Sequence, residues 1–448
     1  MRITLKNVGY IKDADINLNG LNVIAGPNGT GKSTVGKTVY TIIKSVSDSE
    51  KIVYEHRKVL VESMCRALFY SIQKNFQQLD FQQKNRDLNL LMARFNAGFA
   101  RRLVELLKLH DYSSVRESLV SQIKLIDDFA TLDEKSKTAA KKSLNDLMMG
   151  LTSITEQEEI KDSLEFMYDQ MFKLQVNNLG THATSEITLD DNGDKLLEYK
   201  VSNNANVLQF SERLSITEIN ENLRQRILPE VTFVETPLVL QIREKKKEQP
   251  YNLVSDNEKA WPYYWEDLLN KLKDDSGKTR SELCNYVYKD LSDLLKGELI
   301  YDTDKSDFFF VPANTDNKLY VNNMASGEKM FGVLQKMARN GMLSPEHMLV
   351  LDEPENHLHP EWQIKLAELL VTLLEKDVSI LLTTHSSVFI SALQDFAYSK
   401  KLESKVNFYF ADQKNGTIDN VDKFAEKEDV IFKSFYDARK SLPDIDID

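Results

Sequence analysis

The stretch Gly26-Pro27-Asn28-Gly29-Thr30-Gly31-Lys32-Ser33 matches the pattern G-x-x-x-x-G-K-[ST] of a phosphate-binding loop. The apolar residues 21–25 before it predict a strand, and residues 33–45 after it predict a helix. This order forms an anion site, because glycines let backbone N–H groups curl around a phosphate at a helix N-terminus. The stretch therefore predicts a nucleotide phosphate site. A glycine-rich turn that binds nothing is the alternative, and the second half of the chain weighs against it.

Two side chains of this loop have specific expected tasks. Lys32 is expected to reach the β- and γ-phosphates, and the Ser33 hydroxyl to ligate Mg²⁺. ATP and Mg²⁺ are accordingly the expected ligands. The other residues expected to line the nucleotide are Gly26, Pro27, Asn28, Gly29, Thr30, Gly31 and Thr34.

Composition limits the class of protein. The 448 residues can bury a large core and suggest more than one domain. No apolar run approaches the ~18–20 residues that span a bilayer. The first residues predict a strand and not a signal peptide, so we expect a cytoplasmic protein without a membrane partner. Cys65 and Cys284 lie far apart without metal-ligand spacing, which fits reduced thiols.

The net charge of −12 argues against a surface that wraps nucleic acid, because neutralisation of phosphates dominates such binding. A local basic patch stays open at Arg101-Arg102, at Lys141-Lys142 and at residues 243–247. An ordinary solvated surface is the favoured interpretation of each. DNA or RNA is therefore an open partner class and not a required one.

Residues 3–8, 13–18 and 21–25 predict three short strands, and Asn19-Gly20 predicts a hairpin turn between the last two. Residues 46–180 then change character, because proline is absent and glycine is nearly so. Apolar residues recur there at helical spacing, which predicts an all-helical insertion. An antiparallel helical arm and a compact lid are both consistent with this pattern.

Strands return after the insertion. Residues 186–201 predict a hairpin that turns at Asn192-Gly193, and residues 230–235 predict a buried strand. Residues 243–300 have a mostly helical pattern. The Trp/Tyr cluster at residues 261–265 fits core packing better than an interaction surface.

Two later runs supply the chemistry that a phosphate loop requires. The apolar residues 348–351 lead into Asp352-Glu353. An Asp at such a strand end holds Mg²⁺, and the adjacent Glu can polarise the water that attacks the γ-phosphate. A second largely apolar strand, residues 380–384, is followed by His385, which is expected near the γ-phosphate as a sensor.

The order of four motifs resembles the ABC-class ATPases, in their SMC-like and OLD-like branch. The motifs are the phosphate loop, Met-Ala-Ser-Gly-Glu-Lys at 324–329, Leu-Asp-Glu-Pro-Glu-Asn-His-Leu-His-Pro at 351–360, and Thr384-His385-Ser386. In that branch they are Walker A, the signature, Walker B with the D-loop, and the switch histidine.

The resemblance implies an α/β fold, namely an ABC-type P-loop ATPase head with a mixed sheet and an antiparallel β-subdomain, which carries a large all-helical insertion. Residues 1–45 and 181–448 would form the head, with a signature-containing helical part at about 243–345, and residues 46–180 the insertion.

The resemblance also implies a head-to-head homodimer, or a higher homo-oligomer, around two ATP molecules. Ser326, Gly327 and Glu328 would close on the nucleotide of the second subunit. Ala325 occupies the position where the family usually has the signature serine, so Ser326 would supply the hydroxyl. The Q-loop residue stays open between Glu235, Thr236 and Gln241.

Residues 354–363 resemble the D-loop of stand-alone bacterial ATPases of antiphage defence, such as the Septu PtuA-like, PARIS and retron-associated ATPases. Many of these are partnered with a nuclease. The chain after His385 is too short for a nuclease domain, so the resemblance implies a separate nuclease or toxin effector. The acidic residues 444–448 fit a disordered tail better than a metal site.

Two functions compete. The first is an ATP-driven clamp that scaffolds or controls an effector in antiphage defence. The second is an SMC-like ATPase of DNA repair or chromosomes that acts directly on DNA. The long insertion and the Gly-Glu-Lys signature argue against a transporter subunit, and a small-molecule kinase would need neither the signature nor His385.

Overall fold

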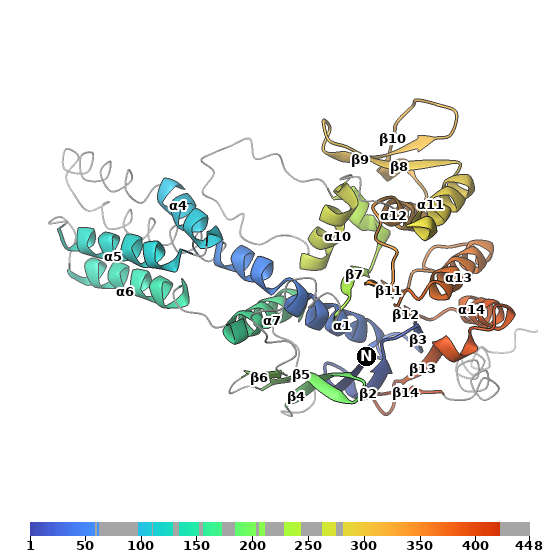
Figure 1. Cartoon of the computed structure of the whole chain (residues 1–448), viewed down its shortest axis with the longest axis horizontal. Helices are drawn as coiled ribbons and strands as arrows, with labels where there is room; N and C mark the ends of the chain where they lie inside the picture. The colour runs from blue at the N-terminus through green and yellow to red at the C-terminus, as the bar shows by residue number, and fades with distance from the viewer. Residues whose placement is uncertain are drawn as a thin grey trace, which may run out of the picture. The chain divides into compact units, whose positions relative to one another are not determined.

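The computed structural model describes residues 1–58, 61, 97–109, 111–128, 134–151, 156–172, 184–202, 206–210, 228–242, 262–274 and 281–421. The chain forms two compact units (Figure 1). The sheet unit comprises Met1–Ser47, Met167–Lys246 and Trp261–Asp448, and the helical unit comprises Asp48–Phe166 and Lys247–Ala260.

A mixed sheet of eleven strands is the framework of the sheet unit, in the spatial order β6-β5-β4-β1-β2-β14-β13-β3-β12-β11-β7. The strands are β1 (Arg2–Val8), β2 (Ile11–Asn17), β3 (Leu21–Ala25), β4 (Ser185–Asp191), β5 (Asp194–Val201), β6 (Asn206–Phe210), β7 (Glu230–Val234), β11 (His347–Asp352), β12 (Ile380–Thr384), β13 (Val406–Asp412) and β14 (Thr417–Asn420). Neighbours from β13 through β7 pair in parallel, whereas those from β6 through β2 pair antiparallel. This arrangement confirms the predicted α/β fold with a mixed sheet and an antiparallel part.

Helices cover both faces of the parallel strands. Those of the sheet unit are α1 (Lys32–Ser47), α10 (Tyr263–Lys273), α11 (Glu282–Leu295), α12 (Ser326–Arg339), α13 (Pro360–Glu375) and α14 (Ser387–Ser399). Every residue of β3, β11 and β12 is buried, as expected for parallel strands between two helical layers. Alternate residues of β11 face opposite layers, since Val350 lies against Gly36 of α1 while Leu349 and Leu351 share a core with α12, α13 and α14.

The turn Asn19-Gly20 does not make the predicted hairpin. Strand β2 pairs with β1 and β14, whereas β3 lies between β13 and β12, parallel to both. Gly20 adopts φ 75°, and a Cβ there would lie 2.3 Å from the carbonyl oxygen of Lys405. The turn therefore needs glycine, but it carries the chain from the antiparallel part into the parallel part. Because every residue of β3 is buried, the strand fits the doubly covered centre of the sheet.

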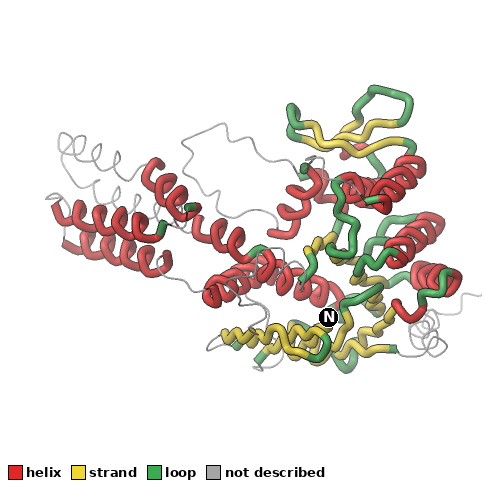
Figure 2. Tube along the Cα trace, in the orientation of Figure 1, coloured by secondary structure: helices red, strands yellow, loops and turns green. Residues whose placement is uncertain are grey.

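The region expected to be mostly helical also contains a second sheet. Its three antiparallel strands are β8 (Gly297–Asp302), β9 (Asp307–Pro312) and β10 (Leu319–Tyr320). Figure 2 shows this sheet apart from the large one. The run Phe308-Phe309-Phe310-Val311 favours a strand, because aromatic and β-branched side chains pack well on a pleated surface. Nearby, Tyr264 is buried and Trp265 packs against the core, which matches the core-packing interpretation of that cluster.

The helical unit contains α4 (Ala97–Lys108), α5 (Tyr112–Asp128), α6 (Glu134–Leu151) and the first part of α7 (Glu156–Phe172). Leu103 and Leu107 of α4, Val115 and Leu119 of α5 and Leu144 of α6 belong to its core. Arg101, Arg102 and Lys142 are exposed, as expected of a solvated surface.

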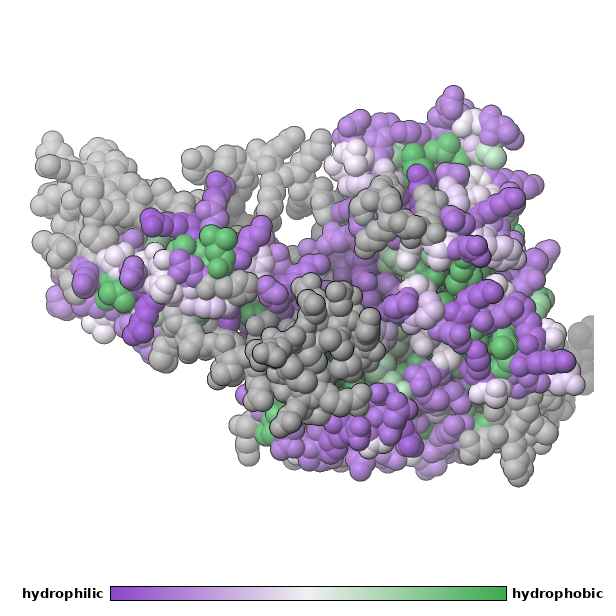
Figure 3. All heavy atoms as spheres, in the orientation of Figure 1, coloured by the Kyte–Doolittle hydropathy of each residue, from purple (hydrophilic) through white to green (hydrophobic). Residues whose placement is uncertain are grey.

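On the face drawn in Figure 3, hydrophilic side chains cover most of the described surface, and hydrophobic ones form small patches. Among the described helices, none has the length and apolar character needed to cross a membrane. Cys284 is buried and unpaired, with its Sγ 3.3 Å from the carbonyl oxygen of Leu343. Cys65 and the segments 243–247 and 444–448 lie outside the described residues.

Candidate nucleotide-binding site

The phosphate loop joins the buried strand β3 to helix α1. Gly26, Gly29 and Gly31 adopt φ of 154°, 78° and 90°, which side chains with a Cβ rarely adopt. A Cβ on Gly26 would lie 2.7 Å from the carbonyl oxygen of Ala411, and one on Gly31 would lie 2.7 Å from Cγ1 of Ile11. The loop thus packs closely against Ala411 and Ile11, and its backbone has conformations that favour glycine.

Lys32 lies inside this loop. Its Nζ donates to the carbonyl oxygens of Gly26 (3.0 Å) and Pro27 (2.9 Å), and only 4% of the residue is exposed. Burial lowers the pKa of Lys32, although Glu353 and Asp352 nearby act in the opposite sense. A buried ammonium held by neutral carbonyls can compensate the charge of a polyphosphate placed in the loop.

Asp352 ends β11 and Glu353 follows it, at the edge where the parallel strands end, and Thr383 occupies the position of β12 that pairs with Asp352. Thr383 Oγ1 donates to Asp352 Oδ1, and the side chain of Ser33 forms a second hydrogen bond with this carboxyl group. Burial raises the pKa of Asp352, and these two hydrogen bonds partly oppose the shift. A carboxylate beside a hydroxyl at this edge is an oxygen pair that suits Mg²⁺.

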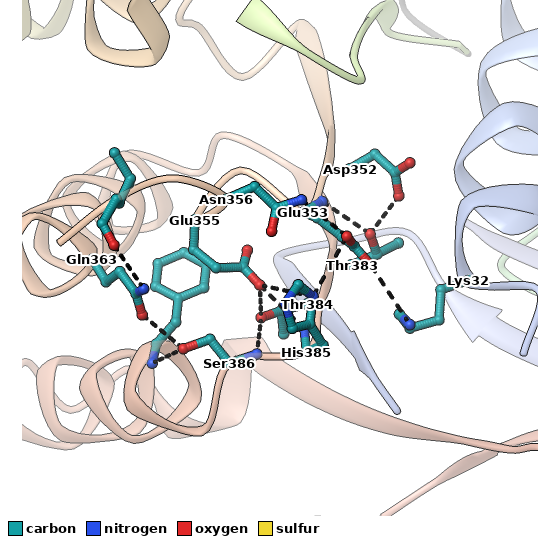
Figure 4. Close-up of polar contacts among 12 residues, drawn as sticks. Lys32, Asp352, Glu353, Glu355, Asn356, Gln363, Thr383, Thr384, His385 and Ser386 are labelled. Atoms are coloured by element: carbon teal, nitrogen blue, oxygen red, sulfur yellow. Dashed lines mark hydrogen bonds and ion pairs between the residues drawn. The ribbon is translucent and has the colours of Figure 1, made fainter. Parts of the chain in front are cut away.

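Glu353 lies between the loop lysine and the histidine (Figure 4). Its Oε1 is 3.7 Å from Lys32 Nζ, and its Oε2 is 3.4 Å from His385 Nδ1 and accepts a hydrogen bond from Asn356 Nδ2 at 3.0 Å. The side chain is 23% exposed. Glu353 also has φ 48°, a strained conformation for a residue other than glycine, and such strain clusters at functional sites.

The signature residues lie at the start of α12, away from this cluster. Ala325 occupies the cap position, Ser326 is the first helical residue, and Glu328 accepts a hydrogen bond from Ala325 N at 3.1 Å. A Cβ on Gly327 would lie 2.8 Å from Cδ2 of Leu358, so the signature packs on the segment that follows Glu353. No hydrogen bond or ion pair between described residues joins the signature to the phosphate loop.

One residue of the Q-loop candidates stands out. Glu235 follows β7 at the same sheet edge and contacts Lys37 Nζ (3.0 Å), Tyr264 OH (2.5 Å) and Trp265 Nε1 (3.2 Å). Burial, followed by the hydrogen bond with Glu235, raises the pKa of Tyr264. Thr236 instead caps the short helix η1 (Pro237–Gln241) by accepting from Leu238 N, and Gln241 ends that helix.

The sequence did not indicate three further polar residues at this edge. Glu355, Gln363 and Thr383 all form hydrogen bonds within it. Glu355 and Gln363 lie in the stretch that resembles a D-loop, but the resemblance assigns no role to either residue. A Thr at the end of a strand is common, so Thr383 carried no specific signal. The hydrogen-bond partners of these side chains can be identified only from the pairing of β11 with β12 in the sheet.

Residues 1–390 match the AAA ATPase domain family, and the chain therefore belongs to this family. It is also similar to Septu protein PtuA of Bacillus mycoides (strain KBAB4), with 25% identity over 173 residues. That match covers 37% of this chain and only 23% of the length of PtuA.

Matches among solved structures include the SMC head domain from Thermotoga maritima, with a TM-score of 0.36 and 11% identity over 94% of this chain and 97% of that one. The recombination mediator protein RecF gives a TM-score of 0.35 and 10% identity over 94% and 97% of the two chains. An SMC head bound to the C-terminal winged-helix domain of ScpA gives 0.40 and 10% over 95% and 98%. The family assignment rests on the sequence match alone.

Proposed function

We propose that the chain binds ATP with Mg²⁺ at this site and hydrolyses it. The observation that carries the proposal is the placement of Glu353, whose two oxygens approach Lys32 and His385. Family membership makes a nucleotide the natural ligand of the phosphate loop. A purified protein that consumes no ATP in single-turnover measurements would contradict the proposed hydrolysis.

Each residue of the cluster has a task in this mechanism. Lys32 leaves the Gly26 and Pro27 carbonyls to compensate the β- and γ-phosphates, while the loop from Gly26 to Thr34 holds the remaining phosphate oxygens. Ser33 and Asp352, which share a hydrogen bond, would hold Mg²⁺, and the bound ion would supply positive charge to neutralise the phosphates.

Glu353 is proposed as the general base. Its carboxylate accepts a proton from water while the water oxygen attacks the γ-phosphorus, and the bond from that phosphorus to the bridging oxygen of ADP breaks. His385, 3.4 Å from Glu353 Oε2, orients the same water and γ-phosphate. Both side chains follow parallel strands, so the sheet fixes their separation.

The signature implies a second subunit. Ser326, Gly327 and Glu328 lie at the N-terminus of α12, where helix N–H groups form an anion site, yet they have no bond to the loop of their own chain. We propose that they bind the γ-phosphate held by the other copy in a head-to-head homodimer. Mass photometry of Glu353→Gln tests this: ATP-Mg²⁺ should convert monomers to dimers, and an unchanged mass would contradict it.

The similarity to PtuA supports a role in antiphage defence. We propose that the ATP-bound dimer scaffolds or controls a separate effector, a nuclease. We also propose that the helical insertion (residues 46–180) and the head (residues 1–45 and 181–448) are the two domains.

The alternative is an SMC-like ATPase that acts directly on DNA. Co-purification of Glu353→Gln with its genomic neighbours, compared with DNA binding by the isolated protein across salt concentrations, separates the two. Retention of a nuclease supports the scaffold. DNA binding that falls steeply with salt supports the alternative.

A further inference from the structure

The end of β12 is fastened to the segment that follows β11 by three hydroxyl groups (Figure 4). Thr383 Oγ1 donates to Asp352, Thr384 Oγ1 to Glu355 and Ser386 Oγ to Gln363. The first bond belongs to the metal site described above. The second involves a carboxyl group to which the proposed hydrolysis assigns no task.

Glu355 is a buried acid with half of its carboxyl group in use. The residue is 3% exposed, and its Oε1 accepts from Thr384 Oγ1 at 2.5 Å and from His385 N at 3.1 Å. Its Oε2 is buried without a hydrogen-bond partner among the described residues. Burial raises the pKa of Glu355, against the effect of these hydrogen bonds. A buried carboxyl group with an idle oxygen costs stability, so stability alone does not account for an acid here.

The imidazole of His385 is placed by its backbone. Its Nδ1 is buried without a hydrogen bond among the described residues, 3.4 Å from Glu353 Oε2 and 3.9 Å from Glu355 Oε1. Among the described residues, no hydrogen bond to Nδ1 fixes the ring beside Glu353. The bond from His385 N to Glu355 fixes the main chain from which the ring projects.

We propose that Glu355 is the positioning residue of His385. By accepting from the Thr384 hydroxyl and from the His385 N–H at once, it sets where the imidazole lies relative to Glu353. It touches neither water nor nucleotide and acts only through His385. This inference rests on the proposed ATP hydrolysis and adds a residue to it.

The test is a double-mutant cycle in ATP hydrolysis by the full chain. Glu355→Gln keeps an acceptor oxygen of the same shape and is expected to retain kcat within about threefold. Glu355→Ala removes the acceptor and should lower kcat about ten- to a hundredfold with little change in KM, because small misplacements of a reacting group have effects of this size. Combining it with His385→Ala should add nothing to the loss caused by His385→Ala alone.

Two further variants protect the test against simple misfolding. Thr384→Val keeps the shape of the side chain, removes one donor to Glu355, and should lower kcat by less than Glu355→Ala. Gln394→Leu replaces a comparably buried polar side chain on α14 and should leave kcat unchanged.

The outcomes separate the inference from the function on which it rests. Losses that multiply in Glu355→Ala/His385→Ala, or a Glu355→Ala protein with normal kcat, overturn the positioning role and leave the hydrolysis intact. A His385→Ala protein as fast as the wild type overturns the role of the histidine in the proposed function, and the positioning role with it.

Discussion

Helix α1 has a buried lysine in its first turn and another in its last turn, and the two are surrounded differently. Lys32 has two carbonyl partners and a carboxylate only at 3.7 Å. Lys44 Nζ lies 3.1 Å from Asp267 Oδ1, and Lys271 Nζ lies 3.1 Å from Asp267 Oδ2. We call the cluster around Lys32 the open end, because its ammonium has no carboxylate of a described residue within hydrogen-bond distance. We call the cluster around Lys44 the closed cluster, because its lysines lie within that distance of a shared carboxylate.

The closed cluster extends over four elements of the sheet unit. Lys271 also contacts Glu230 at 3.3 Å and donates to Thr232 Oγ1 at 2.9 Å, and that hydroxyl lies 2.7 Å from His347 Nε2. Partners within hydrogen-bond distance offset the desolvation of these charges. At the open end, in the part of the chain that the structure describes, Lys32 has only neutral carbonyl oxygens within hydrogen-bond distance, and the Glu353 carboxylate is 3.7 Å from its Nζ. A buried ammonium without a close carboxylate is expected where a charged ligand completes the site.

The largest effect should come from the open end. Glu353→Gln removes the proposed base, and we expect ATP turnover to fall by about 10²–10⁴ while ATP affinity is retained. Single-turnover hydrolysis and nucleotide titration measure the two quantities. Glu368→Gln, which removes a surface carboxylate paired with Lys365, is the control. A Glu353→Gln protein with normal turnover would show that another group is the base.

The next largest effect should come from the closed cluster, where a substitution should lower stability and not turnover. Asp267→Asn leaves two buried lysines without their shared carboxylate, and we expect a loss of about 3–5 kcal/mol in the free energy of unfolding of the sheet unit. Denaturant unfolding followed by tryptophan fluorescence measures it, since Trp265 and Trp362 both pack against that unit's core. The matched control is Asp377→Asn, because Asp377 pairs with Lys405 on the surface. If Asp267→Asn also lowered ATP affinity, the closed cluster would contribute to nucleotide binding as well as to stability.

Lys32→Ala should show the reverse pattern. We expect ATP affinity to fall about 10²–10³-fold, because a preorganised cation facing the phosphates is lost. The unfolding midpoint should not fall, since burial lowers the pKa of Lys32 and the charged side chain therefore weakens the fold. Calorimetric titration and thermal unfolding measure both, with Lys195→Ala, a lysine paired with Glu198 on the exposed side of β5, as control. Unchanged affinity would remove the phosphate-loop assignment.

The sequence predicted the parts of this structure that local patterns encode. Gly26 to Ser33, Asp352 and His385 each follow an apolar run, and parallel strands necessarily bring such ends to one edge. The fold class followed from the family resemblance that these motifs carry. The Asn19-Gly20 hairpin was wrong because a tight turn is compatible with either a hairpin or a crossing into another part of the sheet, and only the burial of β3 decides.

Contacts between distant segments could not be predicted in this way. Asp267 and Lys271 have the spacing of an ordinary surface ion pair on a helix, and nothing nearby in sequence shows that Lys44 lies over them. Glu355 is similar, because its partners on β12 are fixed by sheet register. A buried charge network is thus a property of packing and not of any one segment.

The smallest effect concerns His347, in the closed cluster. Burial first, and then the charges of Lys271 and Lys44, lower its pKa to about 3. Because the folded protein binds this proton more weakly than the unfolded chain, whose histidine pKa is about 6.5, stability should be complete above pH 6.5 and decline as the pH falls toward 3. Between pH 7 and pH 5 we expect a loss of about 1–2 kcal/mol in the free energy of unfolding.

Other groups titrate in the same range, so the comparison must be made with a variant. His347→Gln keeps a polar side chain next to Thr232 and Glu230 but has no proton to gain. Denaturant unfolding at both pH values should show the extra acid loss in the wild type and not in His347→Gln. An equal loss in both proteins would assign the acid sensitivity elsewhere. Asp267 and Glu230 would not account for it, because their pKa values are lowered in the folded protein from 3.8 and 4.5, and the stability they contribute is lost only below this pH range.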